Sequence, residues 1–582
     1  MKNWDLNDLY QGFDETYEND IKRFDELTDE HIKWIHEGKK DDISYIDGYL
    51  KIQEEISKLV RTLYSYASLT MATDVTNQVA PGYLAKLQRI SRKSTAEDVI
   101  FSRYLTTVDL DKLALKSPII KKYLFNLKKE QTEASHLLSE KEEVLYAKLR
   151  ELASGSWGML QSLTTANLPV SYRDKEITLS EVRNLANDGD ASVRCDAYEA
   201  ELKAYAGIED QVSMALSNIK REVVIMNELR GYESALEKTL NQSNMTADTL
   251  NAMIESMKDF RPHFERYLKA KATYLGHKDG LPFYDMFAPV GKLDKTYTFD
   301  EAKDTVLEAF YGYSPRLGDF AKKAFEKEWI DVYPRKGKRG GAFCSNQPQI
   351  HQSRIMTNFT GSLSDVLTLA HELGHGYHGE VISDNDPLHW SYPMPLAETA
   401  SIFCENIVLN HLLKDIIDPK ERLSILENSL QGDTQVIIDI LSRYLFETAL
   451  FEKASGPITK NQMKEMMIES QKEAYLHGLD HDKLHPYMWL NKGHYYSAGL
   501  NFYNFPYAFG LLFGIGLYAQ YEKDPKNFLS SYDDLLALTT KASVETCAKS
   551  MGIDVTKKDF WYDSLNQIKK DIDEVVELLQ KS

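Results

Sequence analysis

The stretch "HELGHGYHGE", His371 to Glu380, carries the strongest chemical signal in this chain. On an α-helix, His371 and His375 lie one turn apart and project from the same face, about 5 to 6 Å apart at Cβ. This spacing suits two ligands of one zinc ion. Glu372 projects about 100° further round the helix, where it can hold a water beside the metal. The pattern HExxH therefore predicts a hydrolytic zinc site.

The residues before this pattern predict that it lies on a helix. Ser362 and Asp365 have the spacing of a capping box, which is typical of a helix N-terminus. An apolar stripe follows at Val366, Leu369, Ala370 and Leu373. Since HExxH also occurs by chance, the alternative is a pair of histidines that serve only packing or the surface.

A third ligand is expected from "PLAETASIFCENIV", which begins at Pro395. Pro395 suits a helix start, and Glu398, Ser401 and Glu405 then share one face. We predict that Glu398 is the third ligand, because catalytic zinc sites use three protein ligands and leave the fourth position to water. Glu405 is predicted to hold a ligand histidine by a hydrogen bond. The alternative for Glu398 is a solvated acid attracted by the helix dipole.

His378 also lies on the metal-binding face, three residues after His375. A further ligand from the next turn would strain a tetrahedral zinc site. We therefore expect His378 to support the ligands or to line the site, rather than to bind the metal.

The stretch "NKGHYYSAGLNFYNFPYAFG", Asn491 to Gly510, interleaves His494 and four tyrosines with three glycines. Aromatic stretches of this kind often serve core packing. The alternative is a loop that hinges at its glycines and closes polar donors over a substrate, as the stabilisation of an oxyanion requires.

Composition and charge exclude several classes of partner. The 582 residues contain 88 acidic and 69 basic side chains, a net charge of −19, so nucleic acid and anionic membranes are poor partners. The first twenty residues lack the pattern of a signal peptide, and four scattered cysteines form no CxxC pair, which together favour a cytoplasmic protein. The longest apolar run, Phe505 to Ala519, is shorter than a membrane span and predicts a buried helix.

The chain is expected to be mainly α-helical. Apolar spacings of three and four recur at 47–69, 139–160 and 571–580. A β-hairpin is predicted at Leu168 to Thr178 and a strand at Arg354 to Phe359. The helical pattern breaks near Asp190, and we place a domain boundary there. This predicts an N-terminal helical lobe, 1–190, with the hairpin near its end, and a catalytic domain, 191–582.

Three motifs in order, "HELGHGYH", "LAETASIFCE" and "GHYYSAGLNFYNFPYAFG", resemble the M3 zinc oligopeptidases, specifically the bacterial oligoendopeptidase F branch. The similarity runs from about Leu202 to the C-terminus. It implies a mainly α, two-lobed metallopeptidase with a deep substrate channel and a small β element beside the metal helix. It further implies one Zn²⁺ per chain and hydrolysis of internal bonds in short peptides. We expect a monomer or small homo-oligomer.

The resemblance assigns roles to the residues of these motifs. It implies that His371, His375 and Glu398 are the zinc ligands and that Glu372 is the general base. His494 and Tyr507 match the family's donors to the reaction intermediate, and Tyr503 is a second candidate, with Tyr495 and Tyr496 as alternatives.

Two further stretches gain a role in substrate binding from the same resemblance. Gly340 and Gly341 allow close approach of a backbone. The stretch from Arg354 to Phe359 is similar to the edge strand beside the cleft of related zinc peptidases, so Met356, Thr357 and Asn358 are expected to pair with an extended peptide.

Two rival functions remain from the sequence. A zinc carboxypeptidase or dipeptidyl carboxypeptidase would need a cationic clamp for the free carboxylate of its substrate, and the sequence does not locate one. A peptide-binding protein without turnover would have lost Glu372 or a ligand, whereas this chain retains all of them.

Overall fold

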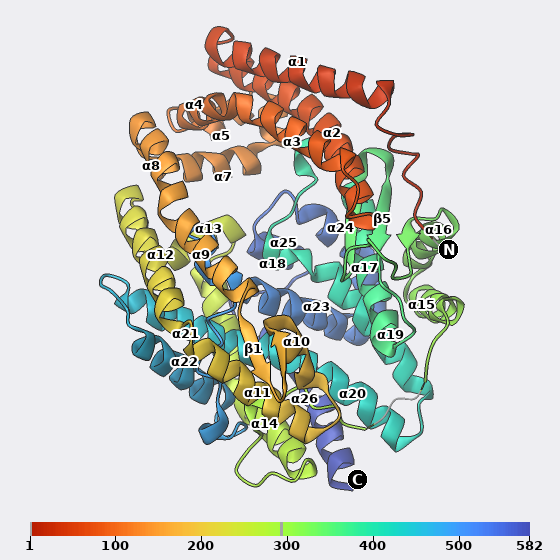
Figure 1. The fold of residues 1–582 in the computed structure, drawn as a ribbon. Helices are drawn as coiled ribbons and strands as arrows, with labels where there is room; N and C mark the ends of the chain where they lie inside the picture. Colours follow the sequence, from red (N-terminus) through yellow and green to blue (C-terminus); the bar gives the residue numbers. More distant parts are fainter. Residues whose placement is uncertain (1–2, 292–294, 582) are drawn as a thin grey trace. The chain divides into compact units, whose positions relative to one another are not determined.

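The computed structural model describes residues 3–291 and 295–581 and is mainly helical with two small sheets (Figure 1). The chain divides into two compact units, each built from three separated segments. The first unit comprises Met1–Leu137, Lys295–Lys414 and Gln520–Gly552. The second comprises Leu138–Asp294, Asp415–Ala519 and Ile553–Ser582. The predicted domains, 1–190 and 191–582, are continuous segments, whereas each compact unit combines three segments. The two divisions describe different things, so the predicted boundary stays a prediction.

The first unit holds the predicted metal helix among many other helices. Those in its described part are α1 (Glu15–Glu37), α2 (Asp42–Thr73), α3 (Val79–Ser91), α4 (Thr95–Leu105), α5 (Leu110–Ala114), α6 (Pro118–Lys122), α7 (Leu124–Ser135), α15 (Phe299–Tyr313), α16 (Pro315–Glu326), α17 (Leu363–Ile382), α18 (Met394–Ala397), α19 (Thr399–Asp415), α24 (Pro525–Leu538) and α25 (Val544–Ser550).

An aromatic core joins the N-terminal helices of the first unit. Helices α1, α2 and α3 lie side by side (Figure 1). Tyr17 of α1 is fully buried, and its hydroxyl donates to the carbonyl oxygen of Leu63 on α2 at 3.0 Å. The same apolar cluster includes Met356, which belongs to the sheet beside the metal helix. These helices therefore support the sheet from one side.

The sheet of the first unit is mixed and small. It contains β3 (Ile330–Asp331), β4 (Phe343–Gln347) and β5 (Gln352–Met356) in the order β3-β5-β4, with β5 parallel to β3 and antiparallel to β4. Both β4 and β5 pack on α17. The sheet therefore places its two longer strands against the helix that carries the histidines.

The expectation of an edge strand at Arg354 to Phe359 is wrong. The strand exists, as β5, but it is the central strand of the sheet. Met356 pairs with Phe343 of β4, and Thr357 donates its N–H to the carbonyl oxygen of Asp331 at 2.9 Å. Backbone groups of Met356 and Thr357 are thus bonded within the sheet and cannot pair with a peptide as well. The sequence pattern showed a strand but contained no information about its neighbours.

Helix α17 begins as predicted. Ser362 is its N-cap, and the reciprocal bonds between Ser362 and Asp365 form a capping box. Asp365 also accepts from the backbone N–H of Gly361 at 3.0 Å. These bonds satisfy donors that the first helical turn leaves unpaired, so they fix where the helix starts.

Helix α17 crosses α19 closely at a glycine. A Cβ built on Gly374 would lie 2.5 Å from the carbonyl oxygen of Ala400 and 2.7 Å from Cα of Ser401. Any larger side chain would force the two helix backbones apart. Gly374, one residue before His375, therefore sets the distance between the histidine helix and the segment that carries Glu398.

The second unit is also helical and contains the predicted hairpin, β1 (Pro169–Tyr172) and β2 (Lys175–Thr178), which pair antiparallel. The helical pattern of 139–160 is confirmed, but the helix breaks at Ala153. The helices of the second unit include α8 (Glu140–Leu152), α9 (Ser154–Ala166), α10 (Leu179–Asn184), α11 (Ala191–Ala206), α12 (Glu209–Arg230), α13 (Ala235–Ser243), α14 (Ala247–Tyr274), α20 (Pro419–Thr434), α21 (Ile440–Lys453), α22 (Lys460–Tyr475), α26 (Lys558–Lys581) and most of α23 (Phe505–Lys523), which continues into the first unit after Ala519.

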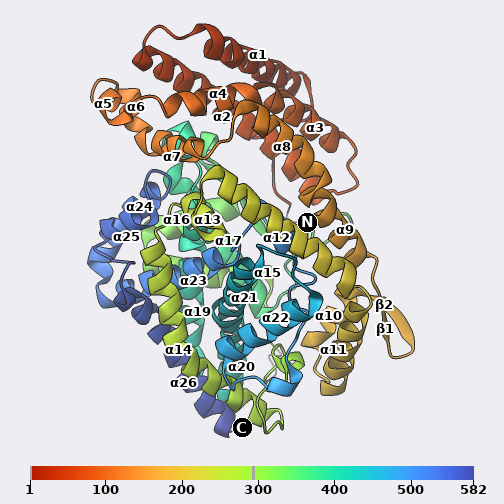
Figure 2. The same ribbon diagram turned by 90° about the vertical axis from the view of Figure 1, so that its left-hand side faces the viewer.

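Long helices form the core of the second unit. Helices α14 and α26 run side by side (Figure 2). Lys271 of α14 is fully buried and donates to Glu427 of α20 at 2.5 Å. The apolar run from Phe505 to Ala519 lies on α23, mostly buried, as predicted. Within 3–291 and 295–581, no helix has the length and apolarity needed to cross a membrane.

Gly374→Ala should lower the free energy of unfolding by about 1 to 3 kcal/mol, since the new methyl group meets backbone rather than a movable side chain. Gly432→Ala on α20 is the matched control, because a Cβ there meets nothing within 4 Å. The control should be neutral or gain up to about 1 kcal/mol from helix propensity. Denaturant unfolding of both variants measures the difference, and equal stability would contradict the close crossing.

Candidate metal centre

Three predicted ligands converge in the first unit. The donor atoms of His371, His375 and Glu398 all lie within 4.8 Å of one another. Glu398 Oε2 is 3.3 Å from His371 Nε2 and 3.4 Å from His375 Nε2. The histidines share a face of α17, and Glu398 lies at the junction of α18 and α19. One carboxylate oxygen thus faces both imidazoles.

Glu405 contacts the other nitrogen of one imidazole. Its Oε2 lies 3.2 Å from His371 Nδ1. A carboxylate accepts hydrogen bonds, so this contact places a proton on His371 Nδ1 and leaves Nε2 as the ring nitrogen that faces His375 and Glu398. Burial lowers the pKa of His371, but the hydrogen bonds with Glu398 and Glu405 outweigh burial and raise this pKa to about 10. The two carboxylates therefore favour a cation at this place.

Glu398 is held in position and ionised. The hydroxyl of Ser401 donates to Glu398 Oε2 at 2.6 Å. Burial acts to raise the pKa of Glu398, but its hydrogen bonds with His371 and His375 hold that pKa well below the usual range. The group is therefore a carboxylate at neutral pH.

Glu372 differs from Glu398 in its surroundings. Its side chain is 6% exposed, and its Oε2 has no hydrogen-bond partner among the described residues. Burial raises its pKa, whereas the nearby imidazoles act in the opposite direction. A buried carboxylate with an unused acceptor and a raised pKa is suited to take a proton from a water.

His378 is not part of the cluster of three donors, and its contacts are with other residues. It is fully buried, its Nε2 lies 2.9 Å from the hydroxyl of Thr539, and its ring stacks on Tyr392 at 4.2 Å. Burial lowers its pKa to about 3, so the ring is neutral. These contacts favour a packing role behind the site. The proposed support of the ligands by His378 stays a prediction.

Sequence reasoning missed Asn346 of β4. Its amide donates to the carbonyl oxygen of His375 at 3.1 Å, and it approaches α17 where a Cβ on Gly379 would lie 2.1 Å from its Cγ. Glycines inside a helix are the available signal, because they weaken a helix and often mark a close approach. Asn346 thereby ties the sheet to the turn of α17 that carries His375.

The predicted loop donors belong to the second unit. His494 Nε2 lies 2.9 Å from the amide nitrogen of Asn504, and burial lowers the pKa of His494 to about 3, so its ring is neutral. The hydroxyls of Tyr503 and Tyr507 lie 2.7 Å apart. The structure thus brings the two candidate tyrosines into one hydrogen-bonded pair. Their roles, and that of His494, stay predictions.

A buried ion pair anchors this loop. Lys220 and Glu447, at 0% and 2% exposure, lie 2.8 Å apart, and Lys220 also donates to Asn501 at 2.9 Å. The second oxygen of Glu447 accepts from the N–H of Phe502 at 2.9 Å. Phe502 has φ of 50°, an uncommon value for a residue with a side chain. This network holds the backbone between Gly499 and Tyr503 in a strained conformation.

The residues present suit a zinc ion. Two imidazoles and one carboxylate are the donor set of one class of catalytic zinc sites, which keep a fourth position for water. The contact of Glu405 with His371 is the arrangement that orients a zinc-bound imidazole. The unpartnered Glu372 oxygen marks where a water would find an acceptor.

Comparisons with known proteins show the family of this chain. Residues 184–567 match the model of peptidase family M3, and residues 107–169 match that of oligopeptidase F. Oligopeptidase PepF of Bacillus subtilis is 25% identical over 592 residues, which cover 99% of this chain and 87% of the relative. Group B oligopeptidase PepB of Streptococcus agalactiae is 27% identical over 532 residues, which cover 87% and 85% of the two chains.

Solved structures share the fold. A peptidase structure from Chlamydophila abortus has a TM-score of 0.84 at 23% identity and covers 99% of this chain and 98% of that one. Oligoendopeptidase-F of Enterococcus faecium has a TM-score of 0.71 at 19% identity, with 99% and 100% coverage. Since the family model matches more than half of the sequence, the chain belongs to peptidase family M3, in its oligopeptidase F branch.

Proposed function

We propose that this protein is a zinc-dependent oligoendopeptidase that hydrolyses internal bonds of short, unstructured peptides. One observation carries the proposal: His371, His375 and Glu398 converge within 4.8 Å, while Glu372 on the same helix is buried with an unused acceptor. A packing role for the histidines would not require three donors to face one point. It would also leave the buried Glu372 carboxylate without a purpose.

The chain's own residues divide the chemistry between them. His371, His375 and Glu398 would hold one zinc ion, which when bound lowers the pKa of water and polarises a carbonyl. Glu372 takes a proton from the attacking water and delivers it to the leaving nitrogen of the scissile bond. Glu405 keeps His371 in the tautomer that leaves Nε2 free.

The free edge of β4 is the better candidate for peptide binding. Ile355 and Thr357 direct their backbone N–H groups to the β3 side, so only the alternate residues of β5 bond to β4. The backbone N–H and C=O groups of Cys344 and Asn346 on β4 therefore point away from β5, to the free edge. A cavity of about 500 Å³ lies beside β4, between Phe343–Ser345 and the end of α2. An extended peptide can add to this edge, and Gly340 and Gly341 have open space around them.

The loop of the second unit would supply further donors. The hydroxyl of Tyr507 or Tyr503 is proposed to stabilise the negative charge that develops on the carbonyl oxygen of the substrate. His494, partly buried and neutral, can donate a hydrogen bond without carrying charge. The shared hydrogen bond of the tyrosines means that removing either hydroxyl also disturbs the other.

Glu372→Gln should lower kcat by about 10²- to 10⁴-fold while zinc stays bound, because the carboxylate acts as base and not as ligand. Peptide turnover and metal content of the purified variant measure this. Glu380→Gln is the control, since Glu380 lies at the far end of the same helix beside Lys323. Loss of zinc from the Glu372 variant would instead assign this residue as a ligand.

Glu398→Ala should lower both zinc content and activity, because it removes a bond to the metal. Glu405→Gln should weaken zinc affinity less, by about 10- to 100-fold, since it only loosens the orientation of His371. Competition with a chromogenic chelator gives both affinities. If zinc affinity survives Glu398→Ala and collapses in the Glu405 variant, the third ligand is Glu405.

Digestion of peptides tests the function and separates it from its nearest rival. Binding along a strand edge requires an extended substrate, which a stably folded protein cannot present without unfolding. We expect internal cleavage of flexible peptides, abolished by chelator, and intact native proteins. Mass analysis of the fragments over time is the measurement. Successive release of C-terminal residues or dipeptides would establish the carboxypeptidase, and binding without cleavage would establish the inactive peptide binder.

A further inference from the structure

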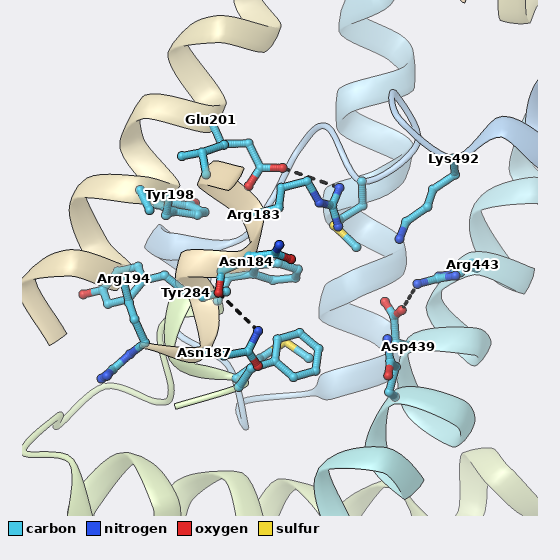
Figure 3. Close-up of a pocket in the computed structure, with 18 residues that line it drawn as sticks. Arg183, Asn184, Asn187, Arg194, Tyr198, Glu201, Tyr284, Asp439, Arg443 and Lys492 are labelled. Carbon is cyan, nitrogen blue, oxygen red and sulfur yellow. Dashed lines mark hydrogen bonds and ion pairs between the residues drawn. The ribbon is translucent and has the colours of Figure 1, made fainter. Parts of the chain in front are cut away.

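The second unit contains a cavity of about 250 Å³ that no part of the proposed mechanism uses (Figure 3). At about 30 Å³ per water, this volume corresponds to roughly eight waters, which suits a group the size of one amino-acid residue. Helices α10 and α11 form one wall, and the segment around Phe283–Asp285 forms another. The remaining wall comes from the π-helix Gln435–Asp439, the start of α21 and Lys492. A π-helical turn of this kind is frequent at functional sites.

Most charges in the cavity wall are paired. Arg194 donates to Asp285 at 2.7 Å, and Arg183 lies 3.6 Å from Glu201. Arg443 forms an ion pair with Asp439. The two charges of each pair neutralise each other. The wall is therefore close to neutral before Lys492 is counted.

Lys492 is the uncompensated charge. Among the residues that the structure describes, no acidic side chain forms an ion pair with its amine. Burial lowers the pKa of Lys492 to about 8, with Arg443 acting in the same direction. Figure 3 shows Lys492 and Arg443 on one side of the cavity and Arg183 and Asn184 on the other. The cavity thus carries one excess positive charge, close to a second cation.

The rest of the lining is apolar or neutral. Phe283, Met286 and Phe287 contribute apolar surface, and Asn184 and Gln435 contribute amides. A small inorganic anion would leave the apolar surface unused. A doubly charged phosphate would exceed the single excess charge. One carboxylate attached to an apolar group matches both features of the wall.

We propose that this cavity binds the C-terminal residue of a peptide, with its α-carboxylate beside Lys492 and Arg443 and its side chain against Phe283 and Met286. The identity of the ligand as a peptide rests on the proposed function. A carboxylate at this place supplies the counter-ion that Lys492 lacks, so binding relieves the cost of a partly buried, unpaired ammonium.

The cavity is also connected to the loop of predicted donors. Arg443 Nη1 donates to Asn504 Oδ1 at 3.4 Å, and the amide nitrogen of Asn504 lies 2.9 Å from His494 Nε2. Lys492 stands two residues before His494. A peptide terminus held by Lys492 and Arg443 therefore contacts the same residues that position His494. Occupancy of the cavity is expected to order this loop.

The test is binding of N-acetyl-glycyl-leucine and of its C-terminal amide to the full-length chain carrying Glu372→Gln, so that no ligand is consumed. Calorimetry should show the acid binding at least about tenfold more tightly than the amide, as expected for a hydrogen bond to a charged group. Lys492→Met should abolish this preference, and Lys492→Arg should retain it. Lys420→Met, at an exposed position of α20, is the control and should retain it too.

Three results would overturn the proposal. One is equal affinity of acid and amide for the unaltered cavity, and another is a preference that survives Lys492→Met. The third is tight binding of N-acetyl-glycyl-glutamic acid α-amide, whose only carboxylate is in the side chain, which would assign the cavity to side-chain carboxylates. Because this assay needs no turnover, a preference lost only in Lys492→Met supports the cavity even if the chain cleaves no peptide. If the chain cleaves peptides but binds the acid and the amide equally, the proposed peptidase function stands and the proposed role of the cavity is wrong.

Discussion

The contact on which the site depends is that of one carboxylate with two imidazoles. Glu398 reaches His371 and His375 because α17 and α19 cross at Gly374, where the absent side chain lets the backbone of Ala400 approach. Three ligands from two separate segments can bind one ion only if this distance is kept. Ser401 and Glu405, both on α19, then fix the two ends of the arrangement through Glu398 and His371.

Electrostatics separate the two carboxylates that stand close to the histidines. Glu398 accepts hydrogen bonds and stays ionised, whereas Glu372 is buried without a partner and its pKa rises. Residues of the same type therefore have different tasks, one to hold a cation and the other to exchange a proton. The difference comes from hydrogen bonding and burial, and not from the chemistry of the side chain itself.

The second unit has a strained backbone at Phe502 and, among its described residues, an unpaired charge at Lys492. The Lys220–Glu447 pair holds Phe502 in an uncommon backbone conformation beside the predicted donors. The cavity beside Arg443 is lined by Lys492, whose amine has no ion-pair partner within residues 3–291 and 295–581. If the cavity binds a peptide terminus as proposed, the contacts from Arg443 through Asn504 couple that binding to the position of His494.

The sequence alone determined the features that arise within one segment. Helical periodicity put His371 and His375 on one face, the capping residues marked the start of α17, and the short β-prone runs around residue 174 predicted the hairpin. Each of these depends on residues a few positions apart, whose relation is set by the backbone geometry of the element itself.

Tertiary structure decided what joins distant segments. The place of β5 at the centre of its sheet depends on partners at 330–331 and 343–347, and the cavity at Lys492 is built from segments between residues 182 and 492. Asn346 meets Gly379 only because β4 packs on α17. Sequence patterns carry the preference of a segment for helix or strand, but neighbours and net local charge follow from long-range packing, which no single segment encodes.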